Sequence, residues 1–340
     1  MSRKNKYLIS SILSCTCFLL LNTLMAQGKL KVVSSASMFT DMTTHIAGDK
    51  IELKTLVPIG GDPHLYEPTP RDADIVNKAD LILINGLHFE GWIIELIENS
   101  GTKAEVITIT EGITPIASSD YKNSYDPHAW MSAENGLSYI ENIKNALMKT
   151  DPANADFYAS NKEKYAEELK QLHRYMKTEI QKIPPAQRVL ITSHDAFKYY
   201  GSTYGLKLEA IMGISTEAEA QTSDIARVIK AIETYKVPAI FIESTINPKM
   251  LKQIAQDNDV AIGGELYADS LGDKNSEGST YVKMLKHNTD VIVSALRDKV
   301  NTRSKHDDDH TKSSPWITYL SVSVALLAGF LIVLYKMNNK

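Results

Sequence analysis

Residues 151–185 read DPANADFYASNKEKYAEELKQLHRYMKTEIQKIPP, and this segment decides how the rest of the chain is divided. Asp151 followed by Pro152 is typical of a helix start, because proline fits the first helical turn. Apolar residues then recur at helical spacing, with no glycine or proline before Pro184 and Pro185. An uninterrupted helix of about 30 residues would be about 45 Å long. The pattern predicts one long rigid helix between two halves of the chain, with small movements rather than a wide clamshell closure.

On each side of this helix, short runs rich in Val, Ile and Leu alternate with longer helical patterns, which indicates βα units. The predicted strands are Lys29–Ser34, Ile51–Val57, Leu81–Asn85, Glu105–Thr108, Arg188–Thr192, Lys207–Ile211, Ala239–Glu243 and Ala261–Gly263. The predicted helices are Met38–Ala47, Arg71–Lys78, Phe89–Asn99, Ala133–Met148, Ala196–Tyr204, Ser223–Tyr235, Pro248–Asp257 and Tyr281–Leu296. The rhythm predicts an α/β fold of two similar lobes, residues 27–150 and 186–300. Each lobe is expected to be a four-stranded, largely parallel sheet flanked by helices.

The N-terminus has the composition of a secretory signal peptide. A basic head precedes an apolar run over residues 7–21, and cleavage is expected after Ala26, so that residues 1–26 are removed. Both cysteines, Cys15 and Cys17, lie in this segment, and the mature chain would contain no thiol. The residues before either cysteine match a lipoprotein cleavage site poorly, so a lipid anchor there is the less favoured alternative.

The other end of the chain predicts a membrane anchor. Residues 316–335 carry no charge, and about 20 such residues span a bilayer as one transmembrane helix. Lys336 and Lys340 follow, which favours the cytoplasmic side for this end. The body is therefore expected to be exported to the periplasmic side and anchored in the cell membrane by this C-terminal helix.

A polar stalk is expected between the body and the anchor, at residues 301–315. It contains His306-Asp307-Asp308-Asp309-His310. We interpret this run as solvated charge in preference to a metal site.

The loop Gly60-Gly61-Asp62-Pro63-His64-Leu65-Tyr66-Glu67-Pro68-Thr69-Pro70 holds an imidazole in a tightly controlled backbone. The glycines free the chain at one end, and the prolines restrict it over the following residues. The tripeptide Asp-Pro-His recurs as Asp126-Pro127-His128. A loop that only connects two elements does not need such control, and this pattern favours two rigidly presented histidines.

Ligands of open α/β sheets collect at the carboxyl ends of the strands. His64 and His128 follow predicted strands of the first lobe, and His194 and Asp269 follow predicted strands of the second. Ser193 is interpreted as a helix cap that places His194 in a first turn, where the helix dipole keeps the imidazole neutral. Three imidazoles and a carboxylate suit a divalent transition metal. The other histidines of the body are interpreted as surface or core residues: His45, His88, His173 and His287.

With these motifs the chain resembles the metal-binding receptors of bacterial zinc and manganese ABC importers, the TroA-like (cluster A-I) family. The resemblance extends from Lys29 to about Val300 and rests on Gly61–Pro70, Asp126–Met131, Ser193–Phe197, Phe241–Ser244 and Glu265–Ser270. It implies two four-stranded α/β lobes bridged by one long helix, with metal ligands at His64, His128, His194 and Asp269. Residues 116–124 contain no histidine, whereas many zinc-selective members carry a His-rich loop there. The predicted C-terminal membrane helix also departs from the free or lipid-anchored members.

The resemblance implies a non-enzymatic, high-affinity receptor outside the membrane. It would capture the ion in the cleft between the lobes and deliver it to the permease of an ABC importer. Nitrogen-rich ligation favours Zn²⁺ as the transported ion, with Mn²⁺ as the alternative. Glu67 and Glu243 are expected to support the ligands.

Two other functions compete with this one. A metal-dependent hydrolase could use the same His/Asp site with Glu67 or Glu243 as a general base. A surface adhesin is the third alternative. The formal net charge of -4 carries no basic surplus, which argues against a nucleic-acid partner.

Overall fold

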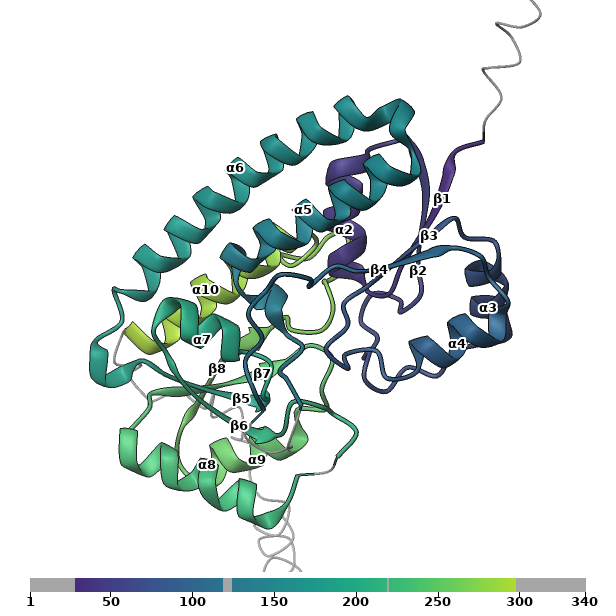
Figure 1. Cartoon of the computed structure of the whole chain (residues 1–340). Helices are drawn as coiled ribbons and strands as arrows, with labels where there is room; N and C mark the ends of the chain where they lie inside the picture. Colours follow the sequence, from purple (N-terminus) through teal and green to yellow (C-terminus); the bar gives the residue numbers. More distant parts are fainter. Residues whose placement is uncertain (1–27, 119–123, 219, 298–340) are drawn as a thin grey trace, which may run out of the picture. The chain divides into compact units, whose positions relative to one another are not determined.

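The computed structural model describes residues 28–118, 124–218 and 220–297. Within these ranges the chain follows the alternation of strands and helices that the sequence predicts (Figure 1). The predicted signal peptide, stalk and transmembrane helix lie outside the described residues. Over the three described ranges, no helix combines the length and the apolar character needed to cross a membrane.

The first half of the body contains a parallel sheet with the strand order β2-β1-β3-β4. Its strands are β1 (Leu30–Ser34), β2 (Ile51–Thr55), β3 (Leu81–Ile84) and β4 (Glu105–Thr108). Side chains alternate between its two faces, as the pleat requires. Helices α3 (Pro70–Asn77) and α4 (Ile93–Ser100) share an apolar cluster with one face. Helices α2 (Ser37–Ala47) and α5 (Ala133–Thr150) pack on the other.

The second half supplies four further strands, but they do not form the predicted four-stranded sheet. They form two parallel pairs, β5 (Val189–His194) with β6 (Lys207–Met212) and β7 (Ala239–Glu243) with β8 (Ala261–Leu266). β5 and β7 are in contact, yet a side chain joins their carboxyl ends. The His194 backbone N–H donates to Glu243 Oε1 at 2.8 Å. The predicted four-stranded sheet of the second half is therefore corrected to two two-stranded sheets.

Helices cover both faces of these strand pairs. On one face, α8 (Thr222–Tyr235) and α9 (Lys249–Asp257) share an apolar cluster with the strands. On the other, α7 (Lys198–Tyr204) and α10 (Tyr281–Arg297) join the largest cluster of the protein. The second half is therefore layered like the first.

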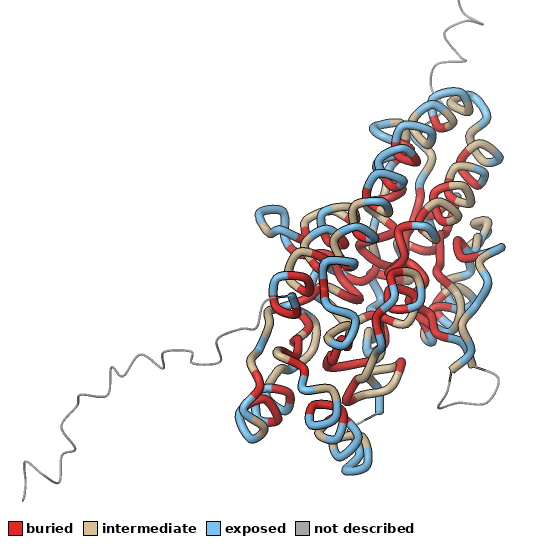
Figure 2. The backbone as a smooth tube through the Cα atoms, turned by 90° about the vertical axis from the view of Figure 1, so that its left-hand side faces the viewer, coloured by how far each residue is buried: buried red, intermediate tan, exposed pale blue. Residues whose placement is uncertain are grey.

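The long helix α6 (Ala155–Ile180) has 26 residues, about 39 Å at the rise of an α-helix. Short 3-10 turns at Pro152–Asn154 and Pro185–Gln187 flank it. Its buried face belongs to the largest apolar cluster, which includes strand residues of both halves, such as Leu83 and Phe241. Buried residues gather between the helices and the strands, and the outer faces of the helices are exposed (Figure 2). The two halves share one core, and the division into lobes at residues 27–150 and 186–300 stays a prediction.

Candidate metal centre

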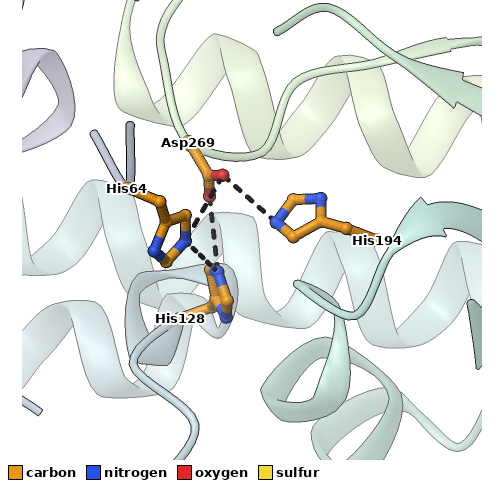
Figure 3. A group of neighbouring side chains, drawn as sticks. All are labelled: His64, His128, His194 and Asp269. Atoms are coloured by element: carbon orange, nitrogen blue, oxygen red, sulfur yellow. Dashed lines mark hydrogen bonds and ion pairs between the residues drawn. The ribbon is translucent and has the colours of Figure 1, made fainter. Parts of the chain in front are cut away.

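Four side chains that the sequence singled out meet at one point (Figure 3). His64 lies in the loop after β2, His128 follows β4, His194 is the last residue of β5, and Asp269 follows β8. Each offers one ligand atom, and these atoms lie within 4.8 Å of one another. His64 is 6% exposed, His128 and His194 are 0% exposed and Asp269 is 1% exposed. The end of β5 and the segments that follow β2, β4 and β8 thus place a buried, compact set of imidazoles around one carboxylate.

His64 is held by its loop. Its backbone N–H donates to Asp62 Oδ1 at 2.9 Å, and the Pro63 carbonyl accepts the Trp92 indole N–H at 2.8 Å. The ring lies edge-on to Phe89, with centroids 5.1 Å apart. Burial lowers the pKa of His64 to about 3. The imidazole is therefore neutral at ordinary pH, which is the form that binds a metal.

His128 is oriented by Asp126, a role that the sequence analysis missed. Asp126 Oδ1 accepts the His128 backbone N–H at 2.8 Å and lies 2.9 Å from its Nδ1. The Asn85 amide fixes the intervening Pro127 carbonyl at 3.0 Å. Because Nδ1 faces a carboxylate, Nε2 faces the centre. The repeated Asp-Pro-His tripeptide was the available signal, but only its second copy brings the aspartate to the ring. Asp62, in the first copy, uses its other oxygen to accept the Thr216 hydroxyl at 2.6 Å.

His194 lies between two carboxylates. Its Nδ1 is 2.6 Å from Glu243 Oε2, and its Nε2 is 3.1 Å from Asp269 Oδ2. Burial by itself lowers the pKa of His194, but the charges of Glu243 and Asp269 outweigh it and hold the pKa well above its usual value. Glu243 therefore lies against the His194 ring, and its role in supporting a metal ligand stays a prediction.

The predicted helix-dipole effect on His194 is wrong. His194 ends strand β5, and the next helix begins at Lys198 with Phe197 as its N-cap. The backbone stays extended through Ser193 because β5 continues to pair with β6 up to His194 and Met212. The state of the ring is governed by its carboxylate neighbours, not by a helix terminus.

Asp269 is the shared partner of the three imidazoles. Its Oδ1 lies 3.5 Å from His128 Nε2, and its Oδ2 lies 3.8 Å from His64 Nε2. Burial raises the pKa of Asp269, but the surrounding histidines, His194 above all, lower it by more. The pKa therefore lies well below its usual range. Asp269 therefore remains a carboxylate.

The segment around Asp269 is fastened to the first half of the chain. The Trp130 indole N–H donates to the Ala268 carbonyl at 3.0 Å, and the Gly60 N–H donates to Ser270 Oγ at 2.7 Å. The Leu271 N–H donates to Ser37 Oγ at 2.9 Å. These bonds flank the aspartate on both sides, so they set its position relative to His64 and His128.

Glu67 does not reach the centre. It is exposed, and its side chain makes none of the hydrogen bonds or ion pairs found among the described residues. Asp72, and not Glu67, supports this loop. Its Oδ2 accepts the Tyr66 hydroxyl at 2.9 Å and the Thr69 N–H and hydroxyl at 2.7 Å each. Asp72 lies at the third helical position after the Thr69 cap, where a capping-box carboxylate belongs. The prediction for Glu67 is therefore corrected.

The histidines interpreted as surface or core residues are not part of the four-residue cluster. His45 stacks on Tyr165, His173 contacts Tyr204, and His287 contacts Tyr267. His88 is exposed in the turn after β3. The stalk run His306-Asp307-Asp308-Asp309-His310 lies outside the described residues.

The geometry and the unpaired atoms of the centre fit a metal ion. A tetrahedron with metal–ligand bonds of 2.0–2.1 Å has edges of about 3.3–3.4 Å, and His64 Nε2 lies 3.4 Å from His128 Nε2. Among the described residues, the His194 Nε2 that faces the centre and both carboxylate oxygens of Asp269 are buried without a well-aligned hydrogen bond. Buried polar atoms normally have partners. An ion bound to these atoms would supply them.

Known proteins with similar sequences and structures bind metals. The manganese ABC transporter substrate-binding lipoprotein PsaA of Streptococcus anginosus is 36% identical over 276 residues, which is 79% of this chain and 89% of that protein. The periplasmic zinc-binding protein TroA from Treponema pallidum matches with a TM-score of 0.76 and 34% identity, over 80% of this chain and all of that one. An Mn-bound periplasmic metal-binding protein from Candidatus Liberibacter asiaticus matches with a TM-score of 0.73 and 36% identity, over 79% and 100% of the chains.

These three proteins are named for binding a substrate or a metal, and not for catalysis. The prediction that the chain is not an enzyme is confirmed by these relatives. Of the two general bases that the hydrolase alternative could use, Glu67 is exposed and is not part of the cluster.

A match to one protein family covers most of the body. Residues 32–295 match the family described as ZnuA, zinc-uptake complex component A, periplasmic. The match includes all four clustered side chains. The chain therefore belongs to the ZnuA family, the TroA-like metal substrate-binding proteins of ABC transporters.

Proposed function

We propose that this chain captures a divalent transition-metal ion outside the membrane and passes it to the permease of an ABC importer. The ligands in this proposal are His64, His128, His194 and Asp269. The observation that carries it is the convergence of their ligand atoms, from four strand ends, to within 4.8 Å in a buried centre. Buried imidazoles and a carboxylate without thiolate suit a borderline ion held in a closed site.

Zn²⁺ is the ion we favour for this site. Two observations support zinc. The site offers three nitrogen ligands, and the 3.4 Å between His64 Nε2 and His128 Nε2 is close to the edge of a tetrahedron of zinc ligands. Mn²⁺, which prefers more oxygen ligands, is the alternative. PsaA, named above for manganese, is among the relatives. The two oxygens of Asp269 face different imidazoles, so the carboxylate could add a second oxygen for the larger ion.

The proposed receptor is exported and stays at the membrane. We place the body (lobes at residues 27–150 and 186–300, joined by residues 151–185) on the periplasmic side. The stalk at residues 301–315 and the transmembrane helix at residues 316–335 would anchor it beside its permease. The lipoprotein name of PsaA makes a lipid on Cys15 or Cys17 the alternative anchor.

Calorimetry on the purified full-length chain in detergent tests the function. We expect about one Zn²⁺ or Mn²⁺ to bind tightly and to raise the melting temperature by mass action. His64→Ala and His194→Ala should abolish tight binding, whereas His45→Ala, which removes an exposed imidazole far along α2, should not. If the wild-type chain binds neither ion, or the two ligand variants keep wild-type affinity, the proposal is wrong.

A further inference from the structure

One cavity leads from the surface to the metal centre. It has a volume of about 360 Å³, and its lining includes the His64 imidazole and Phe89. His64 is also the most exposed of the four clustered side chains, at 6%. A larger cavity of about 490 Å³ lies nearby, but its lining includes none of the four. The smaller cavity is therefore the better path for an ion, and His64 is where that path ends.

The cavity is large enough for a hydrated ion. At about 30 Å³ per water in the liquid, its volume corresponds to roughly a dozen water molecules. A divalent ion with an octahedral shell carries about six. The volume of the cavity therefore accommodates a divalent ion together with its first shell of water.

Besides His64, the cavity presents two side chains of metal-binding type. His88 comes from the turn after β3, and Glu217 comes from the loop after β6. Both are exposed. The rest of the lining is uncharged. An imidazole and a carboxylate from opposite halves of the chain therefore share one opening, and both are ligands that zinc and manganese accept.

The turn that carries His88 is held in an unfavourable conformation. Gly86, Leu87 and His88 have φ values of 78°, 55° and 63°, a region that residues other than glycine rarely occupy. The buried carboxylate of Glu90 fastens this turn by accepting the N–H groups of Asn85 at 2.8 Å and Gly86 at 3.2 Å. Backbone strain that the surroundings maintain is concentrated at functional sites. Here it places His88 at the opening and Phe89 against His64.

We propose that His88 and Glu217 form a transient capture site for a hydrated divalent transition-metal ion on its way to His64. The proposal rests on the proposed function, since it concerns the path to the same centre. The ion exchanges part of its water for the imidazole and the carboxylate, and then moves on to the buried ligands. Such a site lowers the barrier in both directions. The equilibrium affinity of the centre stays the same, because it depends only on the free and the fully bound states.

Stopped-flow kinetics on the full-length chain in detergent separates these effects, with Zn²⁺ alone and Mn²⁺ alone as probes. The Trp130 ring lies 5.2 Å from the His128 ring, so tryptophan fluorescence reports arrival at the centre. The variants are His88→Asn, because asparagine tolerates positive φ, and Glu217→Gln. We expect the association and dissociation rate constants to fall together by about threefold to tenfold. The dissociation constant from calorimetry should change by less than about twofold.

Matched controls are His45→Asn and Glu233→Gln, which replace exposed residues that line neither cavity. They should keep wild-type rates. If His88→Asn and Glu217→Gln also keep wild-type rates, the capture site does not exist. If they weaken affinity through faster dissociation alone, the two residues act on the final site and the proposal is wrong. A wild-type chain that binds neither ion would instead overturn the proposed function itself.

Discussion

Replacing Glu243 by glutamine should weaken metal binding by forcing the wrong tautomer on His194. Glu243 uses Oε1 for the His194 backbone N–H and presents Oε2 to the ring Nδ1 at 2.6 Å. Glutamine can keep only one of these acceptors. With its oxygen on the backbone N–H, its NH₂ group faces Nδ1, and the ring proton must move to Nε2. That nitrogen faces Asp269, and once protonated it cannot bind an ion. In the opposite amide orientation, the NH₂ group of glutamine would face the His194 backbone N–H. Two donors would then face each other, and the backbone hydrogen bond would be lost.

The expected size follows from the role of such partners. Loss of a group that orients a ligand histidine costs about 10- to 100-fold in metal affinity, which is about 1.4–2.7 kcal/mol. At saturating ion, the stabilisation of the folded state by the ion falls by the same amount. The metal-dependent rise in melting temperature should therefore shrink in Glu243→Gln.

Calorimetric competition against a chelator measures this change. Glu67→Gln is the matched control, because Glu67 is exposed and has no side-chain partner among the described residues. It should bind as the wild type does. If Glu243→Gln binds within about twofold of the wild type, the tautomer argument is refuted. If Glu67→Gln loses as much affinity, the effect is not specific to the carboxylate beside His194.

Three further predictions concern stability and anchoring. Burial raises the pKa of Glu90 from 4.5 to about 6, so the folded state holds a proton that the unfolded state has released. The free energy of unfolding should fall by about 2 kcal/mol as the pH rises from about 4.5 to about 6, and denaturant titrations of Glu90→Gln should lack this fall. Trp130→Phe leaves the buried Ala268 carbonyl unpaired and should lower the free energy of unfolding by about 2–4 kcal/mol in the same titrations; an unchanged value would mean that this bond is not needed. Removing residues 316–340 should release the protein from membranes on fractionation, and retention would point to an anchor at Cys15 or Cys17.

Much of the fold could be predicted from local pattern. Buried parallel strands read as short apolar runs, and Glu105–Thr108 and Ala239–Glu243 have the predicted bounds. The long helix begins and ends near its flanking prolines. The rule that ligands gather at strand ends predicts that His64, His128, His194 and Asp269 converge, and their side chains do lie together.

The wrong predictions concern segments whose conformation depends on contacts with residues far away in the sequence. The helix predicted from Phe89 begins at Ile93. Gly86, Leu87 and His88 before it form a left-handed turn, and the buried Glu90 carboxylate accepts backbone N–H groups at the start of that turn. The bond from His194 to Glu243 joins residues 49 positions apart, and no hydrophobic period encodes it. Glu67 and Asp72 lie in one short segment, but the backbone direction decides which of them turns inward.

The wide spacing of the four clustered side chains along the chain has a consequence for the empty receptor. Under the proposed ligation, one ion ties four strand ends at a single point, as a cystine bridge would tie two. The chain has no cysteine after Cys17, so no disulfide can cross-link the body. Under this proposal the bound ion takes that role. Handing the ion to a permease would untie it. The unloaded receptor would then be the more compliant and protease-sensitive form, and delivery itself would mark which copies have been emptied.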